Sequence, residues 1–145
     1  MRIVSQEIQD DMALASKILS EEDVSIIVIK NGEILESKKG KGIKPIIELI
    51  DEMGERLNGM VLGDRILGRA SAFLCRYARV SGVYSPQATK TAIAILILGA
   101  IPCRVDELVP FIRNRDGDGL CPFEDILKDV DDPDTAYKIL KEKIG

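Results

Sequence analysis

The chain contains no histidine and no tryptophan, and it has only three cysteines among 145 residues. The absence of histidine excludes Ser-His-Asp and Cys-His catalysis, histidine proton shuttles and every zinc site that needs an imidazole ligand. The cysteines, Cys75, Cys103 and Cys121, form no C-x-x-C pair. An odd, sparse set of this kind is typical of a reducing compartment rather than of a disulfide framework, so we expect a cytoplasmic protein.

Long apolar runs and an excess of basic residues are also missing. The longest apolar stretch, residues 92–101, is too short to span a bilayer and is expected in the core. The N-terminus turns acidic soon after its start, which is unlike a signal peptide. The net charge of −4 offers no general basic surface to nucleic acid. We therefore expect neither a membrane segment nor a nucleic-acid partner.

What is present is the balance of a soluble globular domain. Apolar residues make up 46% of the chain and charged residues 30%. Three asparagines and three glutamines accompany many glutamates and lysines, a composition that leans toward thermophile proteins. The length suits one domain, and no internal boundary is visible. We predict a single domain over 1–145, with a core of about 1–107 and a helical tail of about 108–145.

Local signals define the elements of the first half of the chain. Ser5 is a suitable N-cap, and Asn31-Gly32 favours the positive φ angles of a tight hairpin turn. Pro45 is tolerated in the first turn of a helix. The pattern predicts a helix at 5–19, antiparallel strands at 24–30 and 33–38, and a helix at 43–57.

The second half alternates short apolar strands with helices, which predicts parallel βαβ units. Asp64 is expected to cap one helix, and Ser85 followed by Pro86 is expected to open the next. Strands that are apolar throughout indicate a sheet covered on both faces. The predicted elements are a strand at 60–63, a helix at about 65–79, a strand at 81–85, a helix at about 86–98, a strand at 101–105, and tail helices at about 123–130 and 134–143.

A likeness to the cytidine deaminase-like fold is carried by two passages, MVLGDRILGRASAFLCRYARVSGVYS and AIAILILGAIPCRV, and by the order of elements over about 1–107. More narrowly, VLGDRILGRASAFL and GVYS resemble a bacterial family called domain of unknown function 1893. The resemblance implies an α/β fold of three layers, α-β-α. Its mixed sheet would combine an antiparallel hairpin with parallel strands. The family likeness implies no assigned chemistry.

The zinc ligands of deaminases are absent from the matching positions. Zinc deaminases start one helix with H-x-E and the next with P-C-x-x-C, which together supply three ligands and a proton-shuttling glutamate. In this chain no ligand-type side chain precedes Glu48, and Asp64 and Gly68 stand near the places of the two thiolates. We therefore expect a deaminase-like scaffold without zinc deaminase chemistry, and we predict no cofactor.

Polar residues gather where the predicted parallel strands end, and ligands settle beyond these ends in open parallel sheets. Helix N-termini that point outward there favour anions, and Arg65 could pair with a phosphate or carboxylate. We predict a site for a small anionic or nucleotide-type ligand, whereas the simpler alternative is helix capping with Arg65 on the surface. The ligand-binding candidates are Asp64, Arg65, Ser85, Gln87 and Thr89, with Asp106 and Glu107 at the third strand end.

A second hypothesis is an enzyme or redox-responsive protein that works without zinc. Cys121 stands at an expected helix N-terminus, which lowers a thiol pKa, although neighbouring carboxylates oppose that effect. The carboxylates Asp64, Asp106 and Glu107 could serve as acid and base if burial separates their pKa values. These four residues are the catalytic candidates. A homo-oligomeric structural protein is the third alternative.

The segment NRDGDGLCPFED, residues 114–125, partly matches a calcium-binding loop. The matching oxygen ligands would be Asn114, Asp116, Asp118 and Asp125. The usual loop begins with aspartate and ends with glutamate, so both terminal ligands are weaker here. Asp-Gly pairs are also strong turn formers. We therefore predict a turn and no metal site.

Overall fold

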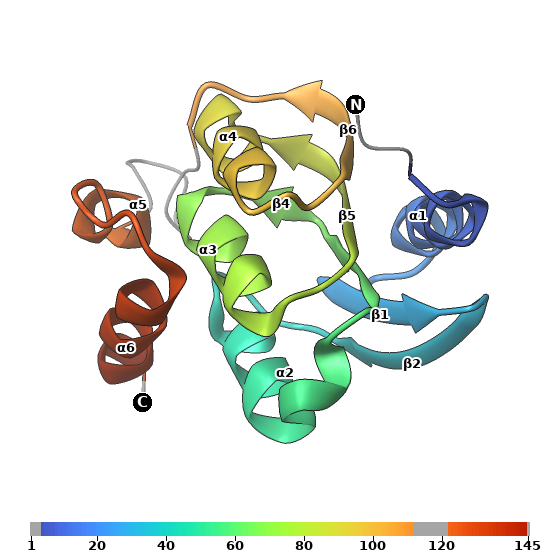
Figure 1. The fold of residues 1–145 in the computed structure, drawn as a ribbon, viewed down its shortest axis with the longest axis horizontal. Coiled ribbons are helices and arrows are strands. Elements are labelled where there is room, and N and C mark those ends of the chain that lie inside the picture. Colours follow the sequence, from blue (N-terminus) through green and yellow to red (C-terminus); the bar gives the residue numbers. More distant parts are fainter. Residues whose placement is uncertain (1–3, 112–121, 145) are drawn as a thin grey trace.

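The computed structural model describes residues 4–111 and 122–144, which form a mixed six-stranded open sheet with helices on both faces (Figure 1). The strand order is β2-β1-β3-β5-β4, and β6 pairs with β5. This architecture confirms the predicted α/β fold with a mixed sheet. The elements are α1 (Gln6–Glu21), β1 (Ile26–Lys30), β2 (Glu33–Lys38), α2 (Lys44–Met53), the 3-10 helix η1 (Gly54–Leu57), β3 (Val61–Asp64), β4 (Ile66–Leu67), α3 (Arg69–Ala78), β5 (Gly82–Ala88), α4 (Lys90–Leu98), β6 (Cys103–Leu108), α5 (Pro122–Ile126) and α6 (Pro133–Ile144).

Two apolar clusters lie on opposite faces of the sheet. On one face α1 packs on β1, β3 and β5, and Gly63 lets the helix lie close, because a Cβ there would stand 3.1 Å from the Ala15 Cβ. On the other face the larger cluster includes α2, α3 and α4. Within the described ranges, no helix combines the length and the apolar character needed to cross a bilayer.

The N-terminal helix and the hairpin form as predicted, and a buried aspartate joins them. The Ser5 hydroxyl accepts the Ile8 N–H at the start of α1, and β1 pairs antiparallel with β2. The buried Asp11 carboxylate accepts the N–H groups of Asn31 and Gly32 at 3.0 and 2.8 Å. Both turn residues have positive φ, so Asp11 fixes the turn that sets the register of the hairpin.

Two predicted helix starts are wrong, and the first error lies at β5. This strand pairs with β3 up to Tyr84 and with β4 from Gln87, so Ser85 and Pro86 lie inside a strand rather than at a helix start. Helix α4 begins at Lys90 instead, and the Thr89 hydroxyl accepts the Ala92 N–H as its N-cap.

Because β4 is inserted after β3, Asp64 is the last residue of a strand and does not cap a helix. Helix α3 starts at Arg69, and its N-cap Gly68 offers no side chain. The strand predicted at 101–105 extends to Leu108, which places Asp106 and Glu107 within β6.

Polar and aromatic contacts tie the last helix to the core. The Tyr137 ring stacks on Tyr77 with 4.1 Å between centroids, and its hydroxyl donates to the Asp51 carboxylate at 2.8 Å. Lys141 forms an ion pair with the same carboxylate. The Lys141 hydrogen bond is the main cause that lowers the pKa of Asp51, and burial with the Asp51 contact raises the pKa of Tyr137 to about 12. Helix α6 is thereby held against α2 and α3.

We expect Asp11→Ala to destabilise the protein, because it leaves two turn N–H groups without their charged acceptor. A hydrogen bond to a charged group contributes about 1.5–3 kcal/mol, so a loss of about 2 kcal/mol or more is expected in urea unfolding. Asp10→Ala, on the exposed side of the same helix, should change the unfolding free energy by less than about 0.5 kcal/mol. Equal effects of the two substitutions would contradict the role of Asp11.

Candidate functional site

The predicted strand-end residues are only partly brought together. A shallow pocket of about 580 Å³ lies at this end of the sheet, and Arg65, Gln87, Asp106 and Glu107 line it together with two apolar residues. Ser85 is fully buried, and its hydroxyl donates to the Gln87 carbonyl at 2.7 Å. Ser85 and the helix-capping Thr89 therefore stabilise the fold and do not line the pocket.

Arg65 lines the pocket, but its guanidinium is bonded to the backbone of α1 and the loop after it. The Nε and Nη2 atoms donate to the carbonyls of Leu19, Glu22 and Val24 over 2.7–3.0 Å. The last carbonyls of a helix lack partners within the helix, and Arg65 supplies them. Its main role in this geometry is to anchor the C-terminal end of α1 to the sheet, not to lie free on the surface.

The charge balance of the strand-end pocket disfavours an anion. Gln87 Nε2 donates to Glu107 at 3.0 Å, and the Tyr84 hydroxyl donates to the Asp106 carboxylate. Arg104 approaches the same carboxylate at 4.0 Å and covers the Tyr84 ring. Two carboxylates thus face a pocket whose lining arginine is already bonded elsewhere, and like charges would repel an anionic ligand.

Asp64 is directed to the opposite face of the sheet from Asp106. The Ser71 hydroxyl of α3 and the Ile66 backbone N–H hydrogen-bond to the Asp64 carboxyl group, whereas Asp106 meets Tyr84 in the cluster beneath α1. Loss of hydration raises the pKa of Asp64 to about 7, against the ordinary 3.8. The three candidate carboxylates therefore do not converge on one reacting position.

Asp64 is partly buried and lies beside fully buried residues of α3. Cys75 lies one helical turn after Ser71 and is fully buried, and burial, with the nearby Asp64, raises the pKa of its thiol. Asp64 lines neither the strand-end pocket nor the pocket described below. Sequence reasoning did not identify Ser71 as a partner of Asp64. The available signal was a small polar residue in the helix that follows Asp64.

The start of α3 is closed by the C-terminal part of the chain. Both Glu124 carboxylate oxygens accept the Arg69 N–H, at 2.9 and 3.0 Å. The Arg69 side chain donates in return to the Leu127 and Lys128 carbonyls at 3.4 and 3.5 Å. Burial raises the pKa of Glu124, although the Arg69 contact opposes this. An anion-favouring helix start is thus filled by a carboxylate of the chain itself.

Several candidates fall outside the described residues. These are Cys121 and the loop residues Asn114, Asp116 and Asp118 of the calcium-like segment, whereas Asp125 is described and exposed. Across residues 4–111 and 122–144, no group of three or more potential ligands stands close enough to hold a metal ion.

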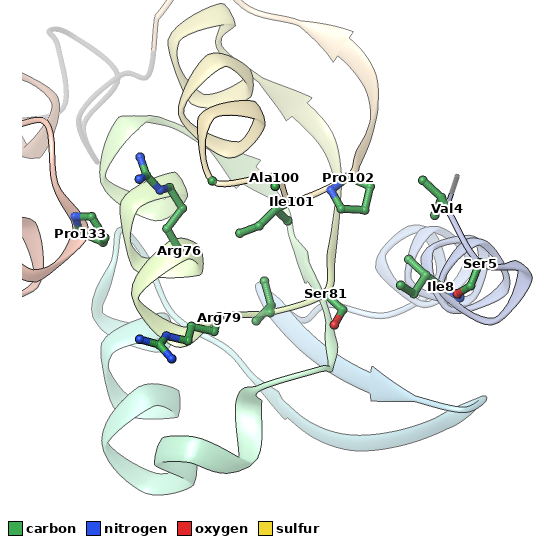
Figure 2. Close-up of a pocket in the computed structure, with 12 residues that line it drawn as sticks. Val4, Ser5, Ile8, Arg76, Arg79, Ser81, Ala100, Ile101, Pro102 and Pro133 are labelled. Atoms are coloured by element: carbon green, nitrogen blue, oxygen red, sulfur yellow. The ribbon is translucent and has the colours of Figure 1, made fainter. Parts of the chain in front are cut away.

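A second pocket, of about 550 Å³, lies at the other end of the sheet, where β5 and β6 begin (Figure 2). Arg76 and Arg79, from the end of α3, stand on one side of it, and Ser5 and Ile8 stand on the other. The floor between them contains Ser81 with apolar residues of the segment before β6. We define these lining residues as the arginine pocket.

Local packing sets the two arginines in place. Gly99 makes room for Arg76, because a Cβ at residue 99 would stand 2.8 Å from the Arg76 Cγ and Nε. Arg79 ends α3 in the left-handed conformation, with φ of 59°, and its side chain is exposed. Sequence reasoning missed this pocket, although Arg76 and Arg79 are three residues apart and therefore neighbours on a helix.

Comparison with known proteins finds one family over most of the chain. The sequence model described as Domain of unknown function (DUF1893) matches residues 14–144. The crystal structure of a DUF1893 family protein from Thermotoga maritima superposes with a TM-score of 0.85 and 25% identity, covering 98% of this chain and 93% of that one. No curated protein matches.

Deaminases are similar at a lower level. The dCMP deaminase of the cyanophage S-TIM5 gives a TM-score of 0.48 and 16% identity over 71% of this chain and 99% of that one. A diaminohydroxyphosphoribosylaminopyrimidine deaminase/5-amino-6-(5-phosphoribosylamino)uracil reductase from Thermotoga maritima gives 0.46 and 15%, over 83% of this chain and 40% of that one. No residue role carries over at this level of similarity.

The raised pKa of Asp64 predicts a pH-dependent stability. The native state holds the Asp64 proton more tightly than the unfolded chain does. The resulting stabilisation of the native state is therefore complete below pH 3.8 and is lost as the pH rises to about 7. We expect the unfolding free energy of the wild type, relative to Asp64→Asn, to fall by on the order of 4 kcal/mol between these limits. Urea unfolding from pH 4 to 8 measures it, with Asp10→Asn as the control. Parallel curves for wild type and Asp64→Asn would refute the assignment.

Proposed function

This chain belongs to the DUF1893 family, a domain of unknown function, and we propose that it binds a small anionic ligand in the arginine pocket. The observation that supports the proposal is that two arginines, Arg76 and Arg79, line one side of a single pocket (Figure 2). Arginine binds carboxylate and phosphate through two parallel hydrogen bonds, which lysine cannot do. The described residues that line the pocket include no carboxylate. The nearby Asp132 carboxylate, whose pKa is lowered mainly by its hydrogen bond from the Thr135 N–H and further by Arg76, leaves Arg79 as the arginine more available to a ligand.

The remaining lining indicates the kind of anion. Ser5 and Ser81 offer hydroxyl groups, while Ile8, Ile101 and Pro102 offer apolar surface between them. A pocket with one charged side and an apolar floor suits a molecule that has a phosphate or carboxylate and an apolar or planar body. A nucleoside monophosphate has this composition, so the nucleotide-type ligand expected from the sequence stays within the proposal, at a different place.

The proposal moves the ligand from the strand ends to the opposite end of the sheet. It is favoured there because the strand-end pocket contains Asp106 and Glu107, and because Arg65 is bonded to α1. A zinc-independent enzyme remains the alternative, and the pKa of Asp64 near 7 is the observation that favours it. Asp64 lines neither pocket and faces the opposite side of the sheet from Asp106, which argues for binding without turnover.

The test is ligand binding by thermal shift followed by titration calorimetry, with inorganic phosphate, citrate and adenosine 5′-monophosphate as probes. We expect at least one probe to raise the melting temperature, and Arg79→Gln to weaken its affinity about tenfold or more, because one charged contact is lost. Arg79 is the better target, since the Arg76 stem also packs on Gly99.

Arg56→Gln provides the matched control, because Arg56 is exposed and lies outside the arginine pocket. Its affinity for the same probe should equal that of the wild type. If no probe changes the melting temperature, or if Arg79→Gln and Arg56→Gln bind equally well, the arginine pocket is not the site.

A further inference from the structure

The outer edge of β6 is an exposed sheet edge. Among the described strands β6 pairs only with β5, and four of its residues, Arg104, Asp106, Glu107 and Leu108, are exposed. An edge strand presents backbone N–H and C=O groups to any second strand that can align with it. Proteins often protect such edges with proline, and the prolines here, Pro102 and Pro110, lie outside the strand.

The sequence of β6 is complementary to itself when two copies run antiparallel. If the Val105 residues of two copies face each other, Arg104 of each copy lies opposite Asp106 of the other. Directly opposed side chains of opposite charge stabilise a strand pair. A single register thus produces two identical ion pairs related by a two-fold axis, which is the pattern of a symmetric dimer.

Exposed apolar side chains lie near both ends of β6, and the same two-fold axis would bring one end beside the other. Helix α4, which leads into β6, is apolar around most of its surface, and Ile97 and Leu98 are 65% and 78% exposed near the start of the strand. Leu108, at the end of the strand, is 52% exposed. Antiparallel pairing brings the start of one β6 to the end of the other. A helix that is apolar on most sides is normally covered, and in this arrangement Leu108 of the second copy would lie at that end of the strand.

We propose that two copies of this chain associate through antiparallel pairing of their β6 strands, with Arg104 opposite Asp106 across the two-fold axis. A second copy fits better than an extended segment of another protein, because the charges and the apolar ends are both matched by this sequence itself. The alternative use of the same charges is to keep the edge unpaired. Charges that pair two β6 strands and charges that keep the edge unpaired predict opposite changes in dimer formation when Arg104 and Asp106 are replaced by residues of opposite charge.

The test is light scattering coupled to size-exclusion chromatography over a range of protein concentrations. We expect the wild type to approach twice the 16.0 kDa of one chain. Arg104→Asp and Asp106→Arg should each weaken the dimer at least tenfold, because like charges then face each other. An equimolar mixture of these two variants should form the dimer again, since every opposed pair becomes Asp with Arg.

Further variants separate assembly from folding. Leu98→Lys, at an exposed position, should also weaken the dimer, whereas Arg56→Asp should leave it unchanged. Thermal unfolding shows whether each variant remains folded, and the double variant Arg104→Asp with Asp106→Arg should dimerise alone. A wild type that stays monomeric, or a mixture that fails to restore the dimer, overturns the proposal.

Discussion

The contact between the Glu124 carboxylate and the Arg69 N–H occupies the start of α3 and joins the C-terminal part of the chain to the sheet core. A helix start beside the strand ends is the usual place for an anion in an open α/β sheet. Here the C-terminal part of the chain fills it with a negative charge of its own. Arg65 is likewise bonded to the end of α1. The other pocket that is lined by arginines, the arginine pocket, lies at the opposite end of the sheet.

The elements that sequence reasoning predicts well are those fixed by neighbouring residues. Ser5 caps α1 and Asn31-Gly32 turns the hairpin because each conformation depends on residues within the same few positions. Asp64 and Ser85 have equally good capping side chains, and yet both lie in strands. Asp64 pairs with Ile26 of β1, and Ser85 lies where β5 exchanges β3 for β4, so only the assembled sheet contains the information that decides their state. Propensity is overruled where a strand gains hydrogen bonds from a second neighbour.

At the candidate site the sequence likewise indicates which residues are unusual, but it does not indicate what they contact. Arg65 and Asp64 are unusual residues, as the sequence indicates, but their partners come from α1 and α3, distant along the chain in the first case. Arg76 and Arg79 look like an ordinary exposed pair on a helix. They become pocket residues because Gly99 and the N-terminal end of α1 reach the same place. No local sequence pattern predicts that the start of α1 will lie opposite the end of α3.

Strand β6 connects the two pockets, which carry opposite charges. Pro102, just before β6, borders the arginine pocket, whereas Asp106 and Glu107, near its end, border the acidic strand-end pocket. One strand therefore runs from a basic end to an acidic end of the molecule. If two copies pair antiparallel along this strand, each basic end lies beside the acidic end of the other copy. The long-range charges then favour the same orientation as the opposed Arg104 and Asp106 side chains, because opposite potentials that face each other lower the free energy of association.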